Sequence, residues 1–397
     1  MLPAFTWRLM TETTPRLLYR FAWNFGWKGM RSVQRFQKRV ARGEHFPAFL
    51  FLSVTNRCNL ACRGCWSTPT QPPQELAPEV LDRIVAESRR HGGSFFGILG
   101  GEPLLYPGLL DFFGRHPDCY FLLFTNGTLL DAAVARRLRQ LGNVSPLISL
   151  EGDAAVSDER RGGRDVFRRS MEGLARCREQ RLITGVATSV CRSNLDALAS
   201  REFLEDLVRR GVHYVWYYIY RPVGPDPAPE LALSAEEIVR LRRFMVDVRR
   251  ELPLLVVDAY WDHDGRALCP AATGIGHHIS AGGFLEPCPP IQFACERVGD
   301  GAGLYDTITQ SAFLAAFRKM ACGQTRGCVL MDCPGVLHNF LAEWKAADSS
   351  GRNTAEEELA RMLCRPCHHL PGQEIPETHW AYRFAKKHWF FGFGAYG

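Results

Sequence analysis

The chain has 397 residues, of which 46% are hydrophobic and 23% charged, a composition that allows a large packed core. At roughly 150 residues per domain, its length predicts two or more domains, and no apolar run approaches the ~18 residues that a membrane-spanning helix needs. Arg8, Glu12 and Arg16 interrupt the first apolar stretch, so we expect no signal peptide there.

Positive charge is concentrated in the first 43 residues, where nine Lys and Arg residues stand against Glu12 alone, about +8 in a chain whose net charge is +6. Aromatic residues alternate with the basic ones, and residues 379–397 have the same composition. We expect both termini to pack on the main domain with their charges solvated. Peripheral membrane contact is the second interpretation, because basic and aromatic residues together suit a membrane interface. No nucleic acid is expected, since no recognition motif accompanies the charge.

From about Phe49 onward, short apolar runs alternate with amphipathic patterns of helical period. The runs predict strands at 48–54, 94–99, 119–125, 146–150, 183–190 and 213–220. The amphipathic patterns predict helices at 78–92 and near 107–115, 130–141, 165–180 and 195–211. This alternation indicates βαβ units with a parallel sheet, an α/β fold in the form of a partial (β/α)6 TIM-like barrel. The chemistry of such barrels lies at the carboxyl ends of the strands.

The barrel pattern ends at residues 221–234, which are rich in Pro and Gly and predict a linker. A helix is expected at 235–252. After it the composition changes, since eight of the fourteen cysteines lie between Cys269 and Cys367. We therefore predict four parts of the chain: a basic, aromatic helical arm at 1–47, a barrel core at 48–255, a smaller cysteine-rich domain at 256–370 and an aromatic, basic tail at 371–397.

Three cysteines, Cys58, Cys62 and Cys65, follow the first predicted strand at the spacing C-x3-C-x2-C. With this many cysteines and no targeting segment, metal or redox use in a reducing cytosol is expected rather than disulfides. Thiolates bind zinc and iron–sulfur clusters. A structural zinc ion needs four protein ligands, and no fourth cysteine lies nearby in the sequence. A 4Fe–4S cluster held by three cysteines leaves one iron open for another ligand.

Three further motifs close or follow predicted strands: GGEPLL at 100–105, TNGT at 125–128 and SLEG-x4-SD-x2-RG at 149–162. Together with the three cysteines they resemble the radical S-adenosylmethionine (radical SAM) enzymes, which carry C-x3-C-x2-C, GGEP, TNG and SLDG-x4-HD-x2-RG in this order. The resemblance covers roughly residues 48–220. The sequence departs from the family pattern at Glu151, which replaces Asp, and at Ser157, which replaces His.

The resemblance implies a 4Fe–4S cluster on the three cysteines, with SAM chelated to the open iron. One electron from the cluster would cleave SAM, and the resulting 5′-deoxyadenosyl radical would abstract hydrogen from a substrate. An electron donor such as flavodoxin or ferredoxin is implied. The residues implied in SAM binding are Gly100, Gly101, Glu102, Asn126, Ser149 and Arg161. Alternatives stay open: a turn for Glu102 and Asn126, and a solvated side chain for Arg161.

The later cysteines resemble a SPASM or Twitch extension, in which radical SAM proteins hold auxiliary iron–sulfur clusters. The implied ligands are Cys269, Cys288, Cys322, Cys328, Cys333, Cys364 and Cys367. The match is incomplete, because Lys319 stands where the usual C-x2-C would begin, and Cys295 and Cys367 are extra. One or two auxiliary 4Fe–4S clusters are expected. Zinc is the alternative, since CRPCHH at 364–369 is a fair zinc half-site.

Other reactive side chains are expected to be structural. The acidic residues and the histidine of DAYWDHDG, at 258–265, predict a polar loop, and His277 and His278 are expected in a hydrogen-bonded loop. Cysteines outside the two sets are expected to be buried, inert thiols; they are Cys119, Cys177 and Cys191.

The substrate class follows only loosely from the sequence. The family resemblance admits a peptide, whereas the basic, aromatic termini admit a lipid-linked or small-molecule substrate. Pro289 stands where some peptide-modifying relatives carry an acidic base, and residues 1–47 are too few and too basic for the common leader-peptide domain. The competing classes are a non-catalytic iron–sulfur carrier or scaffold and a zinc-stabilised membrane-binding module. A cytoplasmic location is expected, with peripheral contact at the inner membrane surface as a further expectation.

Overall fold

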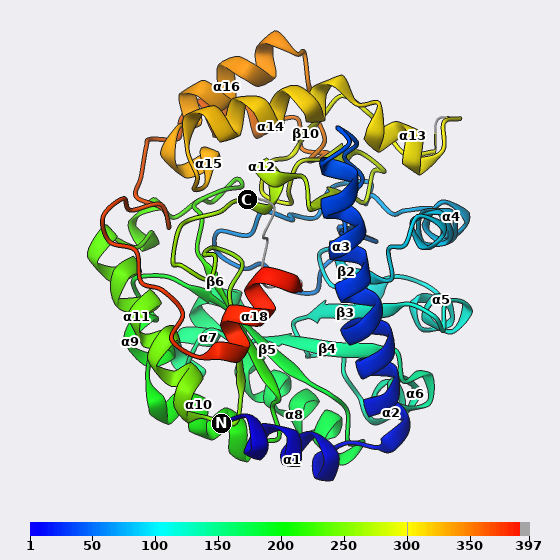
Figure 1. The fold of residues 1–397 in the computed structure, drawn as a ribbon, viewed down its shortest axis with the longest axis vertical. Helices are drawn as coiled ribbons and strands as arrows, with labels where there is room; N and C mark the ends of the chain where they lie inside the picture. The colour runs from blue at the N-terminus through cyan, green and yellow to red at the C-terminus, as the bar shows by residue number, and fades with distance from the viewer. Residues whose placement is uncertain (300, 390–397) are drawn as a thin grey trace.

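The structure, a computed structural model, describes residues 1–299 and 301–389 (Figure 1). Seven parallel strands stand side by side in chain order: β1 (Phe49–Ser53), β2 (Phe95–Leu99), β3 (Tyr120–Thr125), β4 (Val144–Ser149), β5 (Gly185–Val190), β6 (Tyr214–Ile219) and β7 (Leu255–Val257). The helices between them are α4 (Pro78–Arg90), α5 (Leu109–Arg115), α6 (Ala132–Leu141), α7 (Ala154–Arg161), α8 (Val166–Glu179), α9 (Leu195–Leu198), α10 (Arg201–Arg209) and α11 (Ala235–Glu251). The predicted α/β fold with a partial TIM-like barrel is confirmed.

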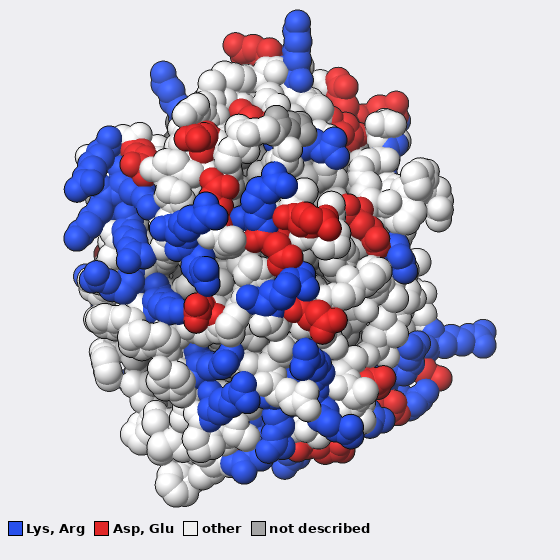
Figure 2. Space-filling model, turned by 90° about the vertical axis from the view of Figure 1, so that its right-hand side faces the viewer, with Lys and Arg blue, Asp and Glu red and all other residues white. Residues whose placement is uncertain are grey.

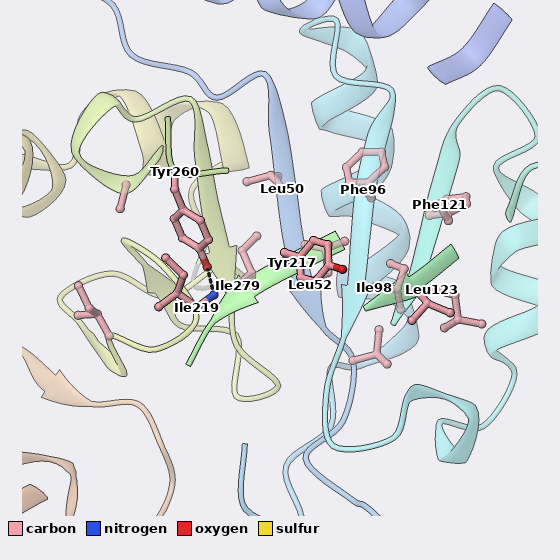
Figure 3. Packing of buried hydrophobic residues seen from close by; sticks show 14 of the residues in the cluster. Leu50, Leu52, Phe96, Ile98, Phe121, Leu123, Tyr217, Ile219, Tyr260 and Ile279 are labelled. Carbon is pink, nitrogen blue, oxygen red and sulfur yellow. Dashed lines mark hydrogen bonds between the residues drawn. The ribbon is translucent and has the colours of Figure 1, made fainter. Parts of the chain in front are cut away.

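The strands bury both faces, which explains their nearly continuous apolar sequences. On the outer face, Leu50 and Leu52 of β1 stand in register with Phe96 and Ile98 of β2, and all four pack with apolar residues of the surrounding helices. Figure 3 shows this row of side chains continuing onto β3. Alternate residues of the same strands, such as Phe51, belong to a second cluster inside the barrel.

Side-chain caps mark the start of several helices. α11 begins with a capping box, in which Ser234 accepts from the backbone N–H of Glu237 while the Glu237 side chain accepts from the Ser234 N–H. The single helix predicted at 195–211 is wrong, because it consists of two helices, α9 and α10. The Ser200 hydroxyl accepts from the N–H of Phe203 and so starts a new helix at Arg201.

The C-terminal region joins the same sheet through β8 (Gly276–Ile279), which pairs parallel with β1, and β9 (Leu285–Glu286), which pairs antiparallel with β8. The remaining elements are α12 (Pro270–Thr273), β10 (Phe293–Ala294), α13 (Leu304–Thr309), α14 (Ala312–Gln324), α15 (Val329–Asp332), α16 (Pro334–Glu343), β11 (Ala347–Asp348) and α17 (Ala355–Ala360). The predicted boundaries at 255 and 370 stay predictions, and β8 links the two parts. The loop predicted for His277 and His278 is wrong, since both lie in β8, a strand too short to show a periodic pattern.

The N-terminal arm consists of α1 (Leu2–Glu12), α2 (Pro15–Arg20), the π-helix η1 (Phe21–Trp27) and α3 (Lys28–Val40). It lies across the amino ends of the strands, where it binds carbonyls that precede them. Arg8 Nη1 donates to Pro253 O at 2.7 Å, Asn24 Nδ2 to Pro117 O at 3.2 Å and Ser32 Oγ to Ala48 O at 2.6 Å. The arm therefore closes the floor of the barrel.

A C-terminal helix, α18 (Trp380–His388), lies beside α3 at the front of the view in Figure 1. A buried ionic network holds it; its members are Asp258, Glu377, Arg242, Arg249 and Lys386. Asp258, expected in a polar loop, belongs to this network. Residues 390–397 of the predicted tail lie outside the described residues. None of the helices formed by the described residues is long and apolar enough to cross a membrane.

Candidate functional site

A cavity of about 410 Å³ runs from the carboxyl ends of the strands into the barrel. The end of the cavity at the carboxyl ends of the strands, which we call the upper end, is lined by both predicted groups of cysteines. They are Cys62 and Cys65 from the loop after β1, and Cys269, Cys288 and Cys328 from the C-terminal region. Ser149, at the end of β4, and Arg161, at the end of α7, line it as well. The predicted SAM side and the predicted auxiliary side thus face one space.

The three cysteines after β1 are electrostatic neighbours. Burial, together with the charge of Cys62, raises the pKa of Cys58 to about 11 and that of Cys65 to about 12. Three adjacent thiolates therefore need a cationic centre. No set of three or more His, Cys, Asp or Glu side chains in the described part of the chain could hold a single metal ion. A cluster accepts more widely spaced thiolates, because each cysteine binds a different iron.

The GGEPLL motif supports this loop from below. The N–H of Gly101 donates to Thr55 O at 2.9 Å, and the N–H of Glu102 donates to Arg57 O at 2.7 Å. A Cβ on Gly101 would lie 2.3 Å from Arg57 O, so only glycine allows the two backbones to approach this closely. The structure thus gives the motif a supporting role. The expected approach of SAM to Gly100 and Gly101 stays a prediction.

Glu102 and Asn126 connect two motifs with the cysteine loop. The fully buried carboxylate of Glu102 accepts from Thr125 Oγ1 at 2.7 Å and from the Asn126 N–H at 2.8 Å, and burial raises its pKa. Asn126 Nδ2 donates to Asn59 Oδ1 at 2.8 Å. Both predicted SAM-binding side chains are therefore fixed by protein contacts, and their contact with SAM stays a prediction.

Arg161 is a cation whose charge acts on Cys58 and Cys65. Its Nη2 pairs with Glu151, and its Nη1 lies 4.0 Å from Cys62 Sγ. Burial opposes its charge, but Glu151 and Cys62 outweigh burial and raise the pKa of Arg161. The side chain is only 17% exposed, which disfavours the solvated alternative. Its buried Nε has no hydrogen-bond partner among the described residues, so one donor is available for an anionic ligand beside the thiols.

Four of the seven predicted auxiliary ligands lie together. The charges of Cys269 and Cys328 both act on Cys288, whose pKa burial raises well above its ordinary value. Cys367 adjoins this group, because its Sγ accepts from the Cys328 N–H at 3.3 Å. Arg221 Nε donates to Cys328 Sγ at 3.2 Å and supplies a positive charge.

The other three predicted auxiliary ligands have other charged neighbours. Cys322 neighbours Arg318 and Arg326, whereas Cys333 and Cys364 neighbour each other. Cys295 is exposed. The thiols expected to be inert, Cys119, Cys177 and Cys191, are buried.

Arg221 is the residue that sequence reasoning missed, because it opens the segment interpreted as a linker. The signal was its position two residues after β6, at the carboxyl end of a barrel strand where functional groups gather. A cation placed there among thiols could have been weighed as part of the site.

Comparison with known proteins gives consistent similarities. The family model described as the radical SAM superfamily matches residues 52–197. The sporulation killing factor maturation protein SkfB of Bacillus subtilis is 25% identical over 257 residues, which are 62% of this chain and 60% of SkfB. An AdoMet-dependent heme synthase of Oleidesulfovibrio alaskensis is 30% identical over 282 residues, which are 62% of this chain and 71% of that protein.

Among solved structures, SuiB of Streptococcus suis bound to S-adenosylmethionine superposes with a TM-score of 0.62 at 18% identity, covering 76% of this chain and 74% of SuiB. At this identity the similarity shows a common fold. The matched region spans less than two thirds of SkfB.

Proposed function

Because the chain belongs to the radical SAM superfamily, we propose that it is an enzyme that binds a 4Fe–4S cluster through Cys58, Cys62 and Cys65 and cleaves S-adenosylmethionine there. Members of this superfamily use that cluster together with SAM. When bound, the pair supplies a one-electron cleavage of SAM and a radical that removes a hydrogen atom from the substrate. The residues proposed to contact SAM are Gly100, Gly101, Glu102, Asn126, Ser149 and Arg161.

One observation carries the proposal. The partly buried thiols of Cys62 and Cys65 line a cavity together with Arg161, whose buried Nε–H has no partner among the described residues. The thiols suit a cluster, and Arg161 suits the carboxylate of a ligand beside it, because charge-assisted hydrogen bonds are the stronger kind. The protein's part is to orient that ligand and to exclude water with the surrounding apolar wall.

For the second group of cysteines we propose one auxiliary 4Fe–4S cluster. Its ligands would be Cys269, Cys288, Cys328 and Cys367, the four thiols that lie together. Arg221 would offset part of the negative charge of the thiolates. The positions of Cys322, Cys333 and Cys364 support no second cluster of four.

The substrate we propose is an organic molecule held in the cavity between the two clusters. SkfB is a maturation protein, and SuiB has been solved with its precursor peptide SuiA, which support a peptide. The basic, aromatic termini support a lipid-linked or small-molecule substrate. We further propose an electron donor such as flavodoxin or ferredoxin, a cytoplasmic location and peripheral contact with the inner membrane surface.

The test is iron content and 5′-deoxyadenosine formation after anaerobic reconstitution with SAM and dithionite. We expect Cys62→Ala to lose about four irons per chain and all 5′-deoxyadenosine. Cys295→Ala is the matched control, and we expect it to behave like the wild type. Full iron content or retained SAM cleavage in Cys62→Ala would reject the proposal, and SAM cleavage by the wild type would exclude a non-catalytic carrier.

A further inference from the structure

The interior of the barrel is hollow instead of filled. A TIM-type barrel ordinarily packs layers of branched side chains into its centre. Here large aromatic rings lie against glycines of neighbouring strands. A Cβ on Gly97 would lie 2.3 Å from the Phe51 ring, and a Cβ on Gly185 would lie 2.2 Å from the Tyr214 ring. Flattened against the wall in this way, the rings leave the centre open.

The lower part of the cavity is therefore an aromatic chamber, which we call the lumen. Its walls include the strands β2, β3 and β6 and the π-helix of the floor; the lining residues there are Phe21, Phe25, Phe95, Tyr120, Leu122 and Trp216. Two of its polar side chains are paired with each other, since Ser145 Oγ bonds to Ile183 O at 2.6 Å and to Tyr214 Oη at 2.8 Å. Such a chamber favours an apolar ligand, because a polar one would lose its hydrogen bonds to water.

The outer surface of the same floor exposes aromatic side chains. Nine large apolar residues are exposed among the described residues, and seven of them lie on the N-terminal arm and α18. These seven, which we call the aromatic face, are Trp7, Met10, Tyr19, Trp23, Trp27, Trp380 and Phe384. Trp23 and Trp27 stack with ring centroids 6.5 Å apart. This concentration marks a contact surface, because exposed apolar residues are usually scattered singly.

Positive charge accompanies the aromatic face. The exposed basic residues of the arm are Arg16, Arg31, Arg35, Lys38 and Arg42. Figure 2 shows Lys and Arg side chains gathered at the left edge of the view and along its lower rim, around an uncharged area at the lower left. Aromatic rings flanked by cations suit the interface of an anionic bilayer, where rings enter the headgroup region and cations meet phosphates.

One helix belongs to both features. η1 presents Phe21 and Phe25 to the lumen, and on its other side it exposes Trp23 and Trp27. The ring of Trp389, which follows α18, packs on Phe25 with centroids 4.9 Å apart. The thickness of a single helix therefore separates the lumen from the aromatic face.

We propose that the lumen binds the apolar chain of a membrane lipid, and that the aromatic face docks the enzyme on the anionic bilayer that supplies it. This rests on the proposed function, since the reacting carbon would have to lie at the upper end of the cavity, beside Cys62 and Cys65.

The first experiment measures binding of radiolabelled palmitate to the reconstituted protein by equilibrium dialysis. Leu122→Trp adds bulk to the lumen, and we expect it to weaken binding by at least ~10-fold, the factor for about two displaced methylenes. Leu363→Trp, at an exposed position outside the aromatic face, should bind like the wild type. If Leu122→Trp does not fold, as judged by circular dichroism, Ala187→Leu fills the same lumen. Equal binding by the wild type and the filled variant would overturn the proposal.

The second experiment measures cosedimentation with vesicles of phosphatidylglycerol and phosphatidylcholine at low salt. We expect Trp23→Ser/Trp27→Ser to lose at least ~10-fold in vesicle affinity, whereas the matched pair Val336→Ser/Leu363→Ser retains it. Equal sedimentation of both double variants would overturn the docking surface.

The two proposals fail separately. Palmitate and vesicle binding require no SAM cleavage, so their presence without 5′-deoxyadenosine would reject only the proposed function. Formation of 5′-deoxyadenosine by a wild type that binds no palmitate would overturn the lipid assignment and favour a peptide substrate.

Discussion

Replacing Asp258 by Asn tests the buried ionic network that holds α18. The network has two carboxylates and three cations, and none of the five side chains is more than 2% exposed. Asp258 accepts from Arg249 Nη2 at 2.5 Å and from Lys386 Nζ at 3.1 Å. Asp258→Asn would leave three buried cations with Glu377 alone, and an uncompensated buried charge typically costs about 3–5 kcal/mol.

Lys386→Met provides the internal comparison. It removes the excess cation and leaves two carboxylates with two arginines, so we expect a loss of only ~1 kcal/mol, chiefly from the hydrogen bond to Trp261 O. The free energy of unfolding in urea, followed by circular dichroism at pH 7, gives both values. Equal losses for the two variants, or a loss below ~1 kcal/mol for Asp258→Asn, would refute the charge-balance reasoning.

The comparison of the wild type with Asp258→Asn also predicts how the free energy of unfolding depends on pH. Although burial alone would raise it, Lys386, Arg249 and Arg242 hold the pKa of Asp258 well below its ordinary value. The stabilisation by Asp258 is therefore complete above the unfolded pKa of ~3.9 and is lost as the pH falls through the lower native value. The difference in stability between wild type and Asp258→Asn should be constant from pH 7 to 5 and shrink below about pH 4.

Gly101→Ala places a Cβ 2.3 Å from Arg57 O and should lower the iron bound at the first cluster while circular dichroism is unchanged; normal iron content would contradict the supporting role. Arg221→Gln removes a positive charge 3.2 Å from Cys328 Sγ and should therefore make the reduction potential of the auxiliary cluster more negative. A redox titration followed by electron paramagnetic resonance measures this potential. An unchanged potential would argue against Cys328 as a ligand of the cluster. Burial lowers the pKa of His213 to about 4, so only the unfolded chain gains this proton between pH 6.5 and 5. The wild type should therefore lose roughly 1.5 kcal/mol more than His213→Gln over that interval in urea unfolding, and parallel losses would refute this.

The part of the site that could be predicted from the sequence is the part built from local segments. Cys58, Cys62 and Cys65 lie within one loop, and each later motif lies at the end of its own strand. Because parallel strands bring their carboxyl ends to one rim, the order of motifs along the chain was enough to bring them together. The strands could be predicted from the apolar runs for a separate reason. Both faces of each strand are buried, so the apolar residues are nearly continuous along the sequence.

The grouping of the later cysteines could not be predicted in this way. Cys269, Cys288, Cys328 and Cys367 come from four separated segments, whereas the charged neighbours of the nearby Cys333 are Asp332 and Cys364. Spacing along the chain does not determine which thiols meet when the intervening segments are irregular. The short strand β8 is a similar case, since its pairing with β1 depends on a partner more than 200 residues away in the chain.

The lumen can stay open because the outer and inner faces of the barrel strands contribute differently to apolar burial. Leu50, Leu52 and Ile98 point outward into the layer shared with the helices, and this larger cluster supplies most of the apolar burial. Because the outer layer stabilises the strands, the inward positions can carry rings beside glycines, such as Phe51 beside Gly97, without filling the centre. A hollow barrel still needs a closed floor, since water in an aromatic chamber would find few partners. The N-terminal arm supplies that floor, and this accounts for why one short segment is aromatic on its inner side and both aromatic and basic on its outer side.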